Sequence, residues 1–394
     1  MRFTELNVVL LLLIPPDVVY HANSVRWLKE YGTVTGLANL NSHFGVNTTW
    51  HSLAAVIDNT IWESRAVWLL PTLGYVSTSG YFFWEIAYSK TNWQKLSAIC
   101  ILCWTFCNVL TWGFPSLHYD FVPLIYNAIL IFETFFLTLE NNKDSNSISK
   151  LLFLAILATA SFVLKPMGAI SVLFIGMYIV YMLYKSNKLK PYNLLIIGII
   201  PFTSFCIWLT RNVLLSGWPL FPSLLLSLDL KWTVPTHITK EAYTDILYWA
   251  RLPGPNYRDV GSNSFMFWFI PWLKNSVTSI RFIFVGTIPL LLGSILWIIN
   301  FKQKSNKYSL YFFSWSLTSV LFWFYLAPDI RFGDGIIFAY LICGLSFFLI
   351  NNESKFSNYL NTKYINSCVI NVIFSSRWCN FNYRQTWPSK SINY

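Results

Sequence analysis

The sequence predicts an all-α membrane protein, a polytopic bundle of about ten transmembrane helices with extracytoplasmic loops that carry interfacial helices. Hydrophobic residues make up 55% of the 394-residue chain and charged residues only 11%. Soluble domains carry about 25% charged residues, so this chain has too few charges for a water-facing surface. Aromatic residues reach 19%, and Trp and Tyr concentrate where a bilayer meets water. This composition excludes a soluble enzyme, a disordered chain and a fibrous protein.

Long apolar runs follow one another along the chain, and each approaches the length of about 17–25 residues that crosses a bilayer as a helix. The nine clear runs are 66–86, 96–113, 121–139, 151–164, 168–184, 192–209, 283–300, 308–326 and 335–350. A tenth run, from Leu6 to Ile14, is short and predicts a weak first helix. A signal peptide is the alternative for it, although no small-residue cleavage site stands before Pro15.

The basic residues predict how the chain is oriented. The net charge is +11, but the cations stand in small groups between apolar runs, which favours a topological role over nucleic-acid binding. The short basic connections contain Lys90, Lys95, Lys143, Lys150, Lys185, Lys188, Lys190, Lys302, Lys304 and Lys307. Lys and Arg are enriched in cytoplasmic loops, so these connections are predicted to be cytoplasmic, as is the tail 351–394 that follows the membrane domain 1–350. The alternate segments 15–65, 114–120, 165–167, 210–282 and 327–334 are then extracytoplasmic.

Two of these outer segments are long enough to hold helices of their own. Segment 15–65 contains HANSVRWLKEYG and TTWHSLAAVID, both with helical period and mixed faces. We expect them to lie along the membrane surface. Segment 210–282 mixes Pro and Gly turns with TKEAYTDILYWARL, which predicts a short amphipathic helix.

No metal site is predicted from the cysteines. Cys100, Cys103 and Cys107 have a CxxC-like spacing, but they lie in an apolar run with no His beside them. Small apolar side chains on a packed helix explain them better than soft metal ligands do.

Polar residues suited to group transfer gather in the predicted outer segments. They are Asp17, His21, His118, Asp120, Lys165, Arg211 and Arg331. A carboxylate such as Asp17 or Asp120 can take the proton of an attacking hydroxyl, and cations can neutralise a departing phosphate.

Each of these residues also has a structural interpretation. Asp17 could cap a helix, and His21 could hydrogen-bond inside a folded loop. His118 and Asp120 could be turn residues, whereas the basic residues at helix ends could reach lipid headgroups. Glu133, inside an apolar run, could be a proton relay or a helix–helix hydrogen bond.

Several motifs resemble those of a largely uncharacterised bacterial family of polytopic membrane proteins. The first is YHANSVRWLKEYGTVTGLANL, followed in the same order by SLHYDF, RNVLLSGWPLFPS, WTVP with YWARLPG, and APDIRFGDG. The helical plan is similar to that of GT-C glycosyltransferases, which use polyprenyl-phosphate-linked sugars. The resemblance implies a bacterial inner-membrane protein with Asp17 as base and Asp120 as second-loop acid. Arg211 or Arg331 would hold the lipid phosphate, and His21, His118 and Lys165 would line the substrate site.

The leading hypothesis is therefore a GT-C-type glycosyltransferase of the cell envelope that acts on a surface glycan or lipid acceptor. A divalent cation could assist through Asp17 and Asp120, although no recognisable ligand spacing supports one. One alternative is a transporter or flippase of a lipid-linked glycan, which would use the same cations without making bonds. The absence of a visible internal repeat favours the enzyme. The other alternative is a non-catalytic membrane subunit.

Overall fold

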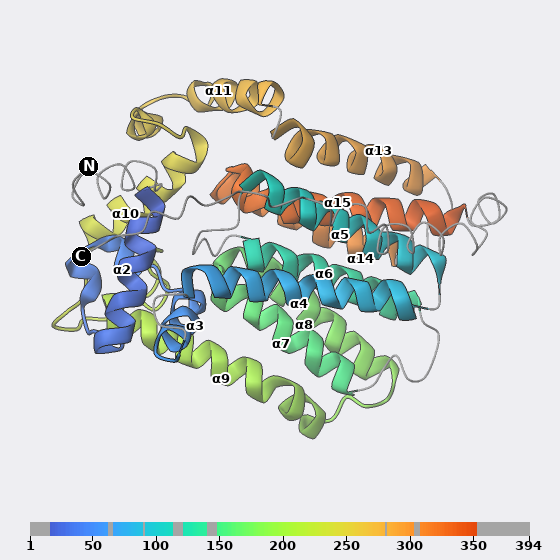
Figure 1. The fold of residues 1–394 in the computed structure, drawn as a ribbon, viewed down its shortest axis with the longest axis horizontal. Helices are drawn as coiled ribbons and strands as arrows, with labels where there is room; N and C mark the ends of the chain where they lie inside the picture. The colour runs from blue at the N-terminus through green and yellow to red at the C-terminus, as the bar shows by residue number, and fades with distance from the viewer. Residues whose placement is uncertain are drawn as a thin grey trace, which may run out of the picture.

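The computed structural model describes residues 16–61, 66–89, 91–112, 121–139, 148–279, 282–302 and 308–352, and all regular elements within these ranges are helical. Figure 1 shows a bundle of roughly aligned long helices with shorter helices gathered at one end. The bundle helices are α4 (Ala66–Tyr88), α5 (Asn92–Trp112), α6 (Phe121–Leu139), α7 (Ile148–Leu164), α8 (Ala169–Lys185), α9 (Pro191–Ser216), α13 (Ile288–Lys302), α14 (Ser309–Leu326) and α15 (Ile330–Asn351). The all-α prediction is confirmed for this part of the chain.

The remaining elements are shorter. They are the α-helices α2 (Pro16–Tyr31), α3 (Thr49–Asp58), α10 (Thr236–Arg251) and α11 (Phe265–Thr278), the 3-10 helices η1 (Leu37–Asn39), η2 (Ser42–Gly45), η4 (Pro166–Gly168) and η5 (Tyr257–Ser262), and the π-helical turn η6 (Ile283–Thr287). The helices predicted from HANSVRWLKEYG, TTWHSLAAVID and TKEAYTDILYWARL are confirmed as α2, α3 and α10. The aromatic helix α11 was not predicted.

Among the residues that the structure describes, four helical stretches are long and apolar enough to cross a membrane, as expected for a membrane protein. They are Pro166–Lys185, Pro191–Ser216, Ile283–Lys302 and Ser309–Leu326. Shorter apolar helical stretches cover Ile125–Leu139, Ile148–Leu164 and Gly335–Asn351. The first and last of these stretches belong to the longer helices α6, of 19 residues, and α15, of 22 residues, which at about 1.5 Å per residue reach about 29 and 33 Å. Within the described residues, each of the nine predicted runs falls almost wholly in a helix. The count of about ten spanning helices is not confirmed, and the run Leu6–Ile14 lies outside the described residues.

The bundle core is aromatic, with α15 packed between α6, α13 and α14. The Phe135 ring contacts Phe312 and Phe347 with centroids 5.3 and 4.8 Å away, and all three rings are fully buried. On the α13 side, the Asn300 amide donates to Gly344 O at 2.8 Å. Helices in lipid associate by such close packing and interhelical hydrogen bonds, because burial from lipid supplies no hydrophobic driving force.

Polar side chains inside the bundle also join helices. The Tyr81 hydroxyl of α4 donates to a Glu133 carboxylate oxygen of α6. Of the two interpretations of Glu133, the structure therefore shows the helix–helix hydrogen bond. Nearby, Ser161 of α7 and Ser171 of α8 both donate to Asn127 Oδ1, at 3.3 and 2.6 Å.

The end of the bundle at which α7 and α9 finish, called here the α2 end, carries most of the added structure. Figure 1 shows α2, α3 and α10 gathered there, with α2 lying across the direction of the bundle helices. The turn 186–190, which joins α8 to α9, lies at the opposite end. Segments 16–61 and 217–264, far apart in sequence, therefore meet at one end of the molecule.

Candidate functional site

The first added unit, α2 with α3, is fixed to the ends of α7 and α9 by side-chain hydrogen bonds. Thr48 caps α3 and also donates its hydroxyl proton to Leu164 O at 2.8 Å. Thr49 donates to Val163 O at 3.2 Å. These contacts hold α3 against the last turn of α7, and Lys165 follows directly.

A buried pair of histidines joins α2 to α3. His21 Nδ1 lies 2.9 Å from His51 Nε2, and the two side chains are only 2% and 3% exposed. Burial, with smaller contributions from His21 and the Arg211 charge, holds the pKa of His51 well below the usual 6.5. His51 is therefore neutral at neutral pH, and one ring of the pair donates the shared proton while the other accepts it.

Arg211, from the last turns of α9, lies against the same unit. Its Nη1 donates to Thr48 O at 3.2 Å and to Ser52 Oγ at 2.5 Å, so one guanidinium nitrogen holds both the cap and the first turn of α3. Arg211 and His51 share a cavity of about 10 Å³, which Ser24 and Gly32 also line. That volume suffices for about one water molecule.

A series of rings leads from this pair to the surface. The Tyr20 ring lies 4.0 Å from His21 and 5.0 Å from His43, measured between centroids. His43 is exposed, and its backbone N–H donates to Asn41 Oδ1 at 2.9 Å. Aromatic and imidazole rings thus extend from the exposed η2 to the buried His51.

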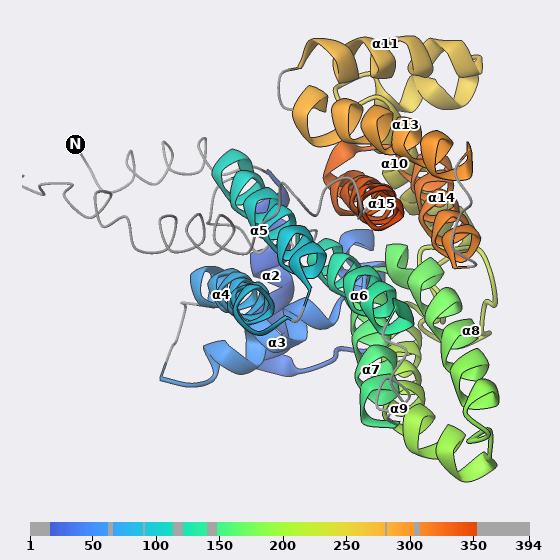
Figure 2. The same cartoon turned by 90° about the vertical axis from the view of Figure 1, so that its right-hand side faces the viewer.

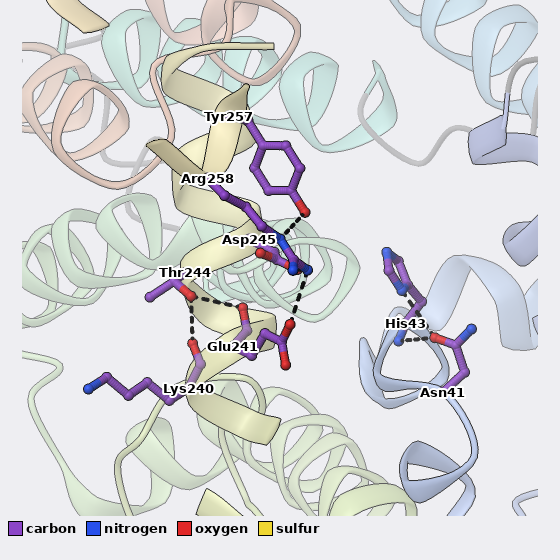
Figure 3. Close-up of polar contacts among 8 residues, drawn as sticks. All are labelled: Asn41, His43, Lys240, Glu241, Thr244, Asp245, Tyr257 and Arg258. Atoms are coloured by element: carbon purple, nitrogen blue, oxygen red, sulfur yellow. Dashed lines mark hydrogen bonds and ion pairs between the residues drawn. The ribbon is translucent and has the colours of Figure 1, made fainter. Parts of the chain in front are cut away.

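An exposed group of charged residues lies across from His43 on α10 and η5. Figure 3 shows Arg258 beside Tyr257 and Asp245, with Glu241 one turn along α10. Arg258 Nη2 is 2.9 Å from Asp245 and 3.0 Å from Glu241, and its Nε donates to the Tyr257 hydroxyl at 2.9 Å. Exposed ion pairs of this kind contribute little stability, so the group is first of all a hydrophilic surface.

A second buried cluster forms where the α7–η4 turn meets the α14–α15 turn. Lys165 is buried, and its Nζ lies 3.6 Å from the centroid of the Phe332 ring. Asp329 is also buried, and its carbonyl oxygen accepts from Trp323 Nε1 at 2.8 Å. Because the Thr48 hydroxyl donates a hydrogen bond to Leu164 O, this cluster adjoins the unit of α2 and α3 that contains the two histidines.

The structure brings together several residues that the sequence singled out. His21 and Arg211 meet through α3, and Lys165 lies against the first turn of α15, which contains Arg331. Asp17 belongs to the first turn of α2, one turn before His21, but the side chains of Asp17 and Arg331 are not among those described. His118 and Asp120 lie outside the described residues.

Sequence reasoning missed His51 and Ser52 as members of the cluster. The signal was present, because His51 shares the buried face of α3 with Ala54 and Ala55. A polar ring on an apolar helix face needs a hydrogen-bond partner. Among the described residues, no three His, Cys, Asp or Glu side chains converge as metal ligands.

The sequence motifs have a common structural role, because they bind one another. The Gly36 N–H donates to Leu214 O at 2.7 Å, and the Asn39 amide donates to Trp232 O at 2.7 Å. Trp232 Nε1 in turn donates to Val213 O at 3.0 Å. The GLANL, RNVLLSGWPLFPS and WTVP segments therefore form one connected structure on the end of α9.

Residues 17–338 match one family along their whole length, and its description is Domain of unknown function (DUF8201). The chain belongs to the DUF8201 family. The matched range contains both buried clusters and all the motifs above, and it covers the described elements from α2 to the first part of α15. No match was found among curated proteins or among solved structures.

Proposed function

We propose that this DUF8201 protein is an integral membrane glycosyltransferase of GT-C type. It would transfer a sugar from a polyprenyl-phosphate donor to a cell-surface glycan or lipid acceptor. One observation carries the proposal: His21, Lys165 and Arg211, from three distant segments, occupy adjoining clusters at the end of the bundle where α2 begins. A donor whose tail lies in the bilayer presents its phosphate and sugar at this level of the membrane helices.

The transfer requires a base and a cation with separate roles. Asp17 or Asp120 removes the proton of the acceptor hydroxyl, and the oxygen attacks the anomeric carbon from the face opposite the phosphate. The bond between that carbon and the phosphate oxygen breaks with inversion, and its electron pair leaves with the polyprenyl phosphate. Lys165 and Arg331 stabilise that growing negative charge.

The remaining residues position this machinery. Arg211 already donates to Thr48 and Ser52, so we assign it to holding α3 rather than to binding phosphate. His51 then holds His21, which stands one turn after Asp17 on α2. In this proposal the chain crosses the bacterial cytoplasmic membrane several times, and the α2 end faces the extracytoplasmic side.

The test is an assay of the purified chain in vesicles that contain a labelled polyprenyl-phosphate sugar and an acceptor extract from the host envelope. Loss of a general base lowers the rate by about 10²–10⁴-fold, so Asp17→Asn or Asp120→Asn should remove most of the product. Asp245→Asn is the matched control, because Asp245 is an outer-segment carboxylate that pairs with the exposed Arg258. Full activity in both Asn variants would refute the mechanism. Movement of labelled lipid across the vesicle without product would instead identify a flippase.

A further inference from the structure

The helix α11 has no hydrophilic face along most of its length. Its sequence from Phe265 to Leu273 is FMFWFIPWL, and Lys274 is its first charged residue. A helix that is hydrophobic on all sides is either buried in protein or in contact with lipid. Burial on all sides does not apply here, because one face of α11 is open.

The closed face of α11 packs on the α14–α15 region. Trp268 is 5% exposed, and its ring covers the Arg251 guanidinium at 5.0 Å. Trp272 Nε1 donates to Pro328 O at 2.6 Å, and its ring lies 5.4 Å from Phe324. Trp272 therefore fixes α11 to the turn that contains Asp329, and Trp268 packs it against Arg251 of α10.

The open face is an apolar stripe of helical spacing. Met266, Ile270 and Leu273 are 55%, 59% and 45% exposed, and positions four and three apart lie on one side of a helix. This stripe contains no polar side chain that could face water.

The stripe continues a surface that belongs to a candidate membrane span. On α13, Leu291, Ile295 and Ile298 are 58%, 52% and 57% exposed, and they also follow helical spacing. Figures 1 and 2 both show α11 and α13 along the same edge of the molecule. Acyl chains that cover α13 therefore lie beside α11, whose exposed polar residues Lys274 and Asn275 come only at its end toward α13.

We propose that α11 is immersed in the acyl chains of the bilayer leaflet at the α2 end, with Met266, Ile270 and Leu273 facing lipid. With 14 residues it is about 21 Å long, too short to cross a hydrocarbon core of roughly 30 Å. It lies within one leaflet, and Lys274 extends its ammonium group to the headgroups. Lipid thus contacts the helix whose Trp272 is hydrogen-bonded to the Ala327–Asp329 turn. This inference does not depend on glycosyl transfer.

The experiment is photo-crosslinking of the full chain in nanodiscs of phosphatidylcholine and phosphatidylglycerol. A benzophenone amino acid is incorporated at Ile270, or separately at Leu273. The positive control is Ile295 on α13, and the negative control is Glu241, whose side chain is 58% exposed on α10. All four side chains are exposed, so the substitution leaves the core intact.

After irradiation, the mass of the intact protein should show lipid adducts for positions 270, 273 and 295 and none for position 241. If positions 270 and 273 match position 241 while position 295 gives adducts, the stripe faces water and the proposal is overturned. Adducts to a second protein chain in place of lipid would also overturn it.

Discussion

The contact between His21 and His51 is the most specific side-chain pairing at the α2 end. The two imidazoles, 2.9 Å apart, share one proton in the hydrogen bond between them, and burial disfavours any further proton that would charge the pair. Arg211 lines the same cavity as His51, and its positive charge makes protonation of the pair still less favourable. The arrangement therefore holds α2 on α3 most firmly when both histidines are neutral.

This makes stability depend on pH in a defined direction. The folded pKa of His51 is lowered, so the unfolded chain binds more protons than the folded chain as the pH falls below 6.5. The contribution is fully present above that pH and is lost progressively below it. The midpoint temperature of thermal unfolding in detergent should decrease as the pH is lowered from 7 to 5. His51→Gln should make that decrease smaller. His43→Gln, which alters an exposed ring, should keep it, and an equal fall in the His51 variant would contradict the assignment.

Arg211 should not tolerate lysine, because a single ammonium cannot reproduce the geometry of a guanidinium bonded to Thr48 O and Ser52 Oγ. Each hydrogen bond to a charged group contributes about 1.5–3 kcal/mol, so Arg211→Lys should lower the unfolding free energy by roughly that amount. Arg26→Lys is the control, since Arg26 forms an exposed pair with Glu30 and its replacement should cause no measurable shift. A fully stable Arg211→Lys variant would mean that the two hydrogen bonds do not hold α3.

At the scale of elements, close helix packing depends on small residues. A Cβ atom built on Gly293 would lie 2.7 Å from the Tyr340 ring and 3.2 Å from Leu341 Cα, so α13 approaches α15 as closely as a glycine allows. Gly344 faces α13 in the same way, with Leu296 and Trp297 at 3.3 Å. Small residues at helix contacts let backbones approach in lipid, where packing replaces the hydrophobic effect.

Gly293→Ala should therefore destabilise the bundle by about 1–3 kcal/mol through overpacking. Gly198→Ala on α9 is a matched control, because nothing lies within 4 Å of its Cβ position and alanine favours the helix. Thermal unfolding in one detergent compares the two directly. Equal midpoints for both variants would show that α13 can move away from α15 at little cost.

The elements also show what the sequence could predict and what it could not. Runs of apolar residues predicted helices because length and hydropathy are local properties, and α4 to α9 follow them closely. The aromatic helix α11 was missed because it is shorter than a membrane span and lacks the polar face of a surface helix. At the site, the sequence named His21 and Arg211, but their connection through His51 and Ser52 depends on tertiary contacts between α2, α3 and α9.

At the scale of the whole molecule, the two ends of the bundle differ in chemistry. The α2 end carries the buried His21–His51 pair and the docked motif segments. The other end carries exposed cations on the α8–α9 connection, where Lys188 and Lys190 follow a turn with Asn187 in a left-handed conformation. A cation-rich turn of this kind is typical of a cytoplasmic loop. The difference predicts that the α2 end is extracytoplasmic.

Labelling of whole cells with a membrane-impermeant maleimide tests that orientation. Lys240 on α10 and Asn187 are both exposed, so Lys240→Cys and Asn187→Cys place comparable thiols at opposite ends of the bundle. Labelling above that of the unsubstituted chain, which corrects for its seven native cysteines, is expected for Lys240→Cys only. Asn187→Cys should react only after the cells are permeabilised. The reverse pattern would show that the α2 end faces the cytoplasm. Lipid-linked sugars of the extracytoplasmic leaflet could not reach the His21–His51 end there, and the proposed transfer would be refuted.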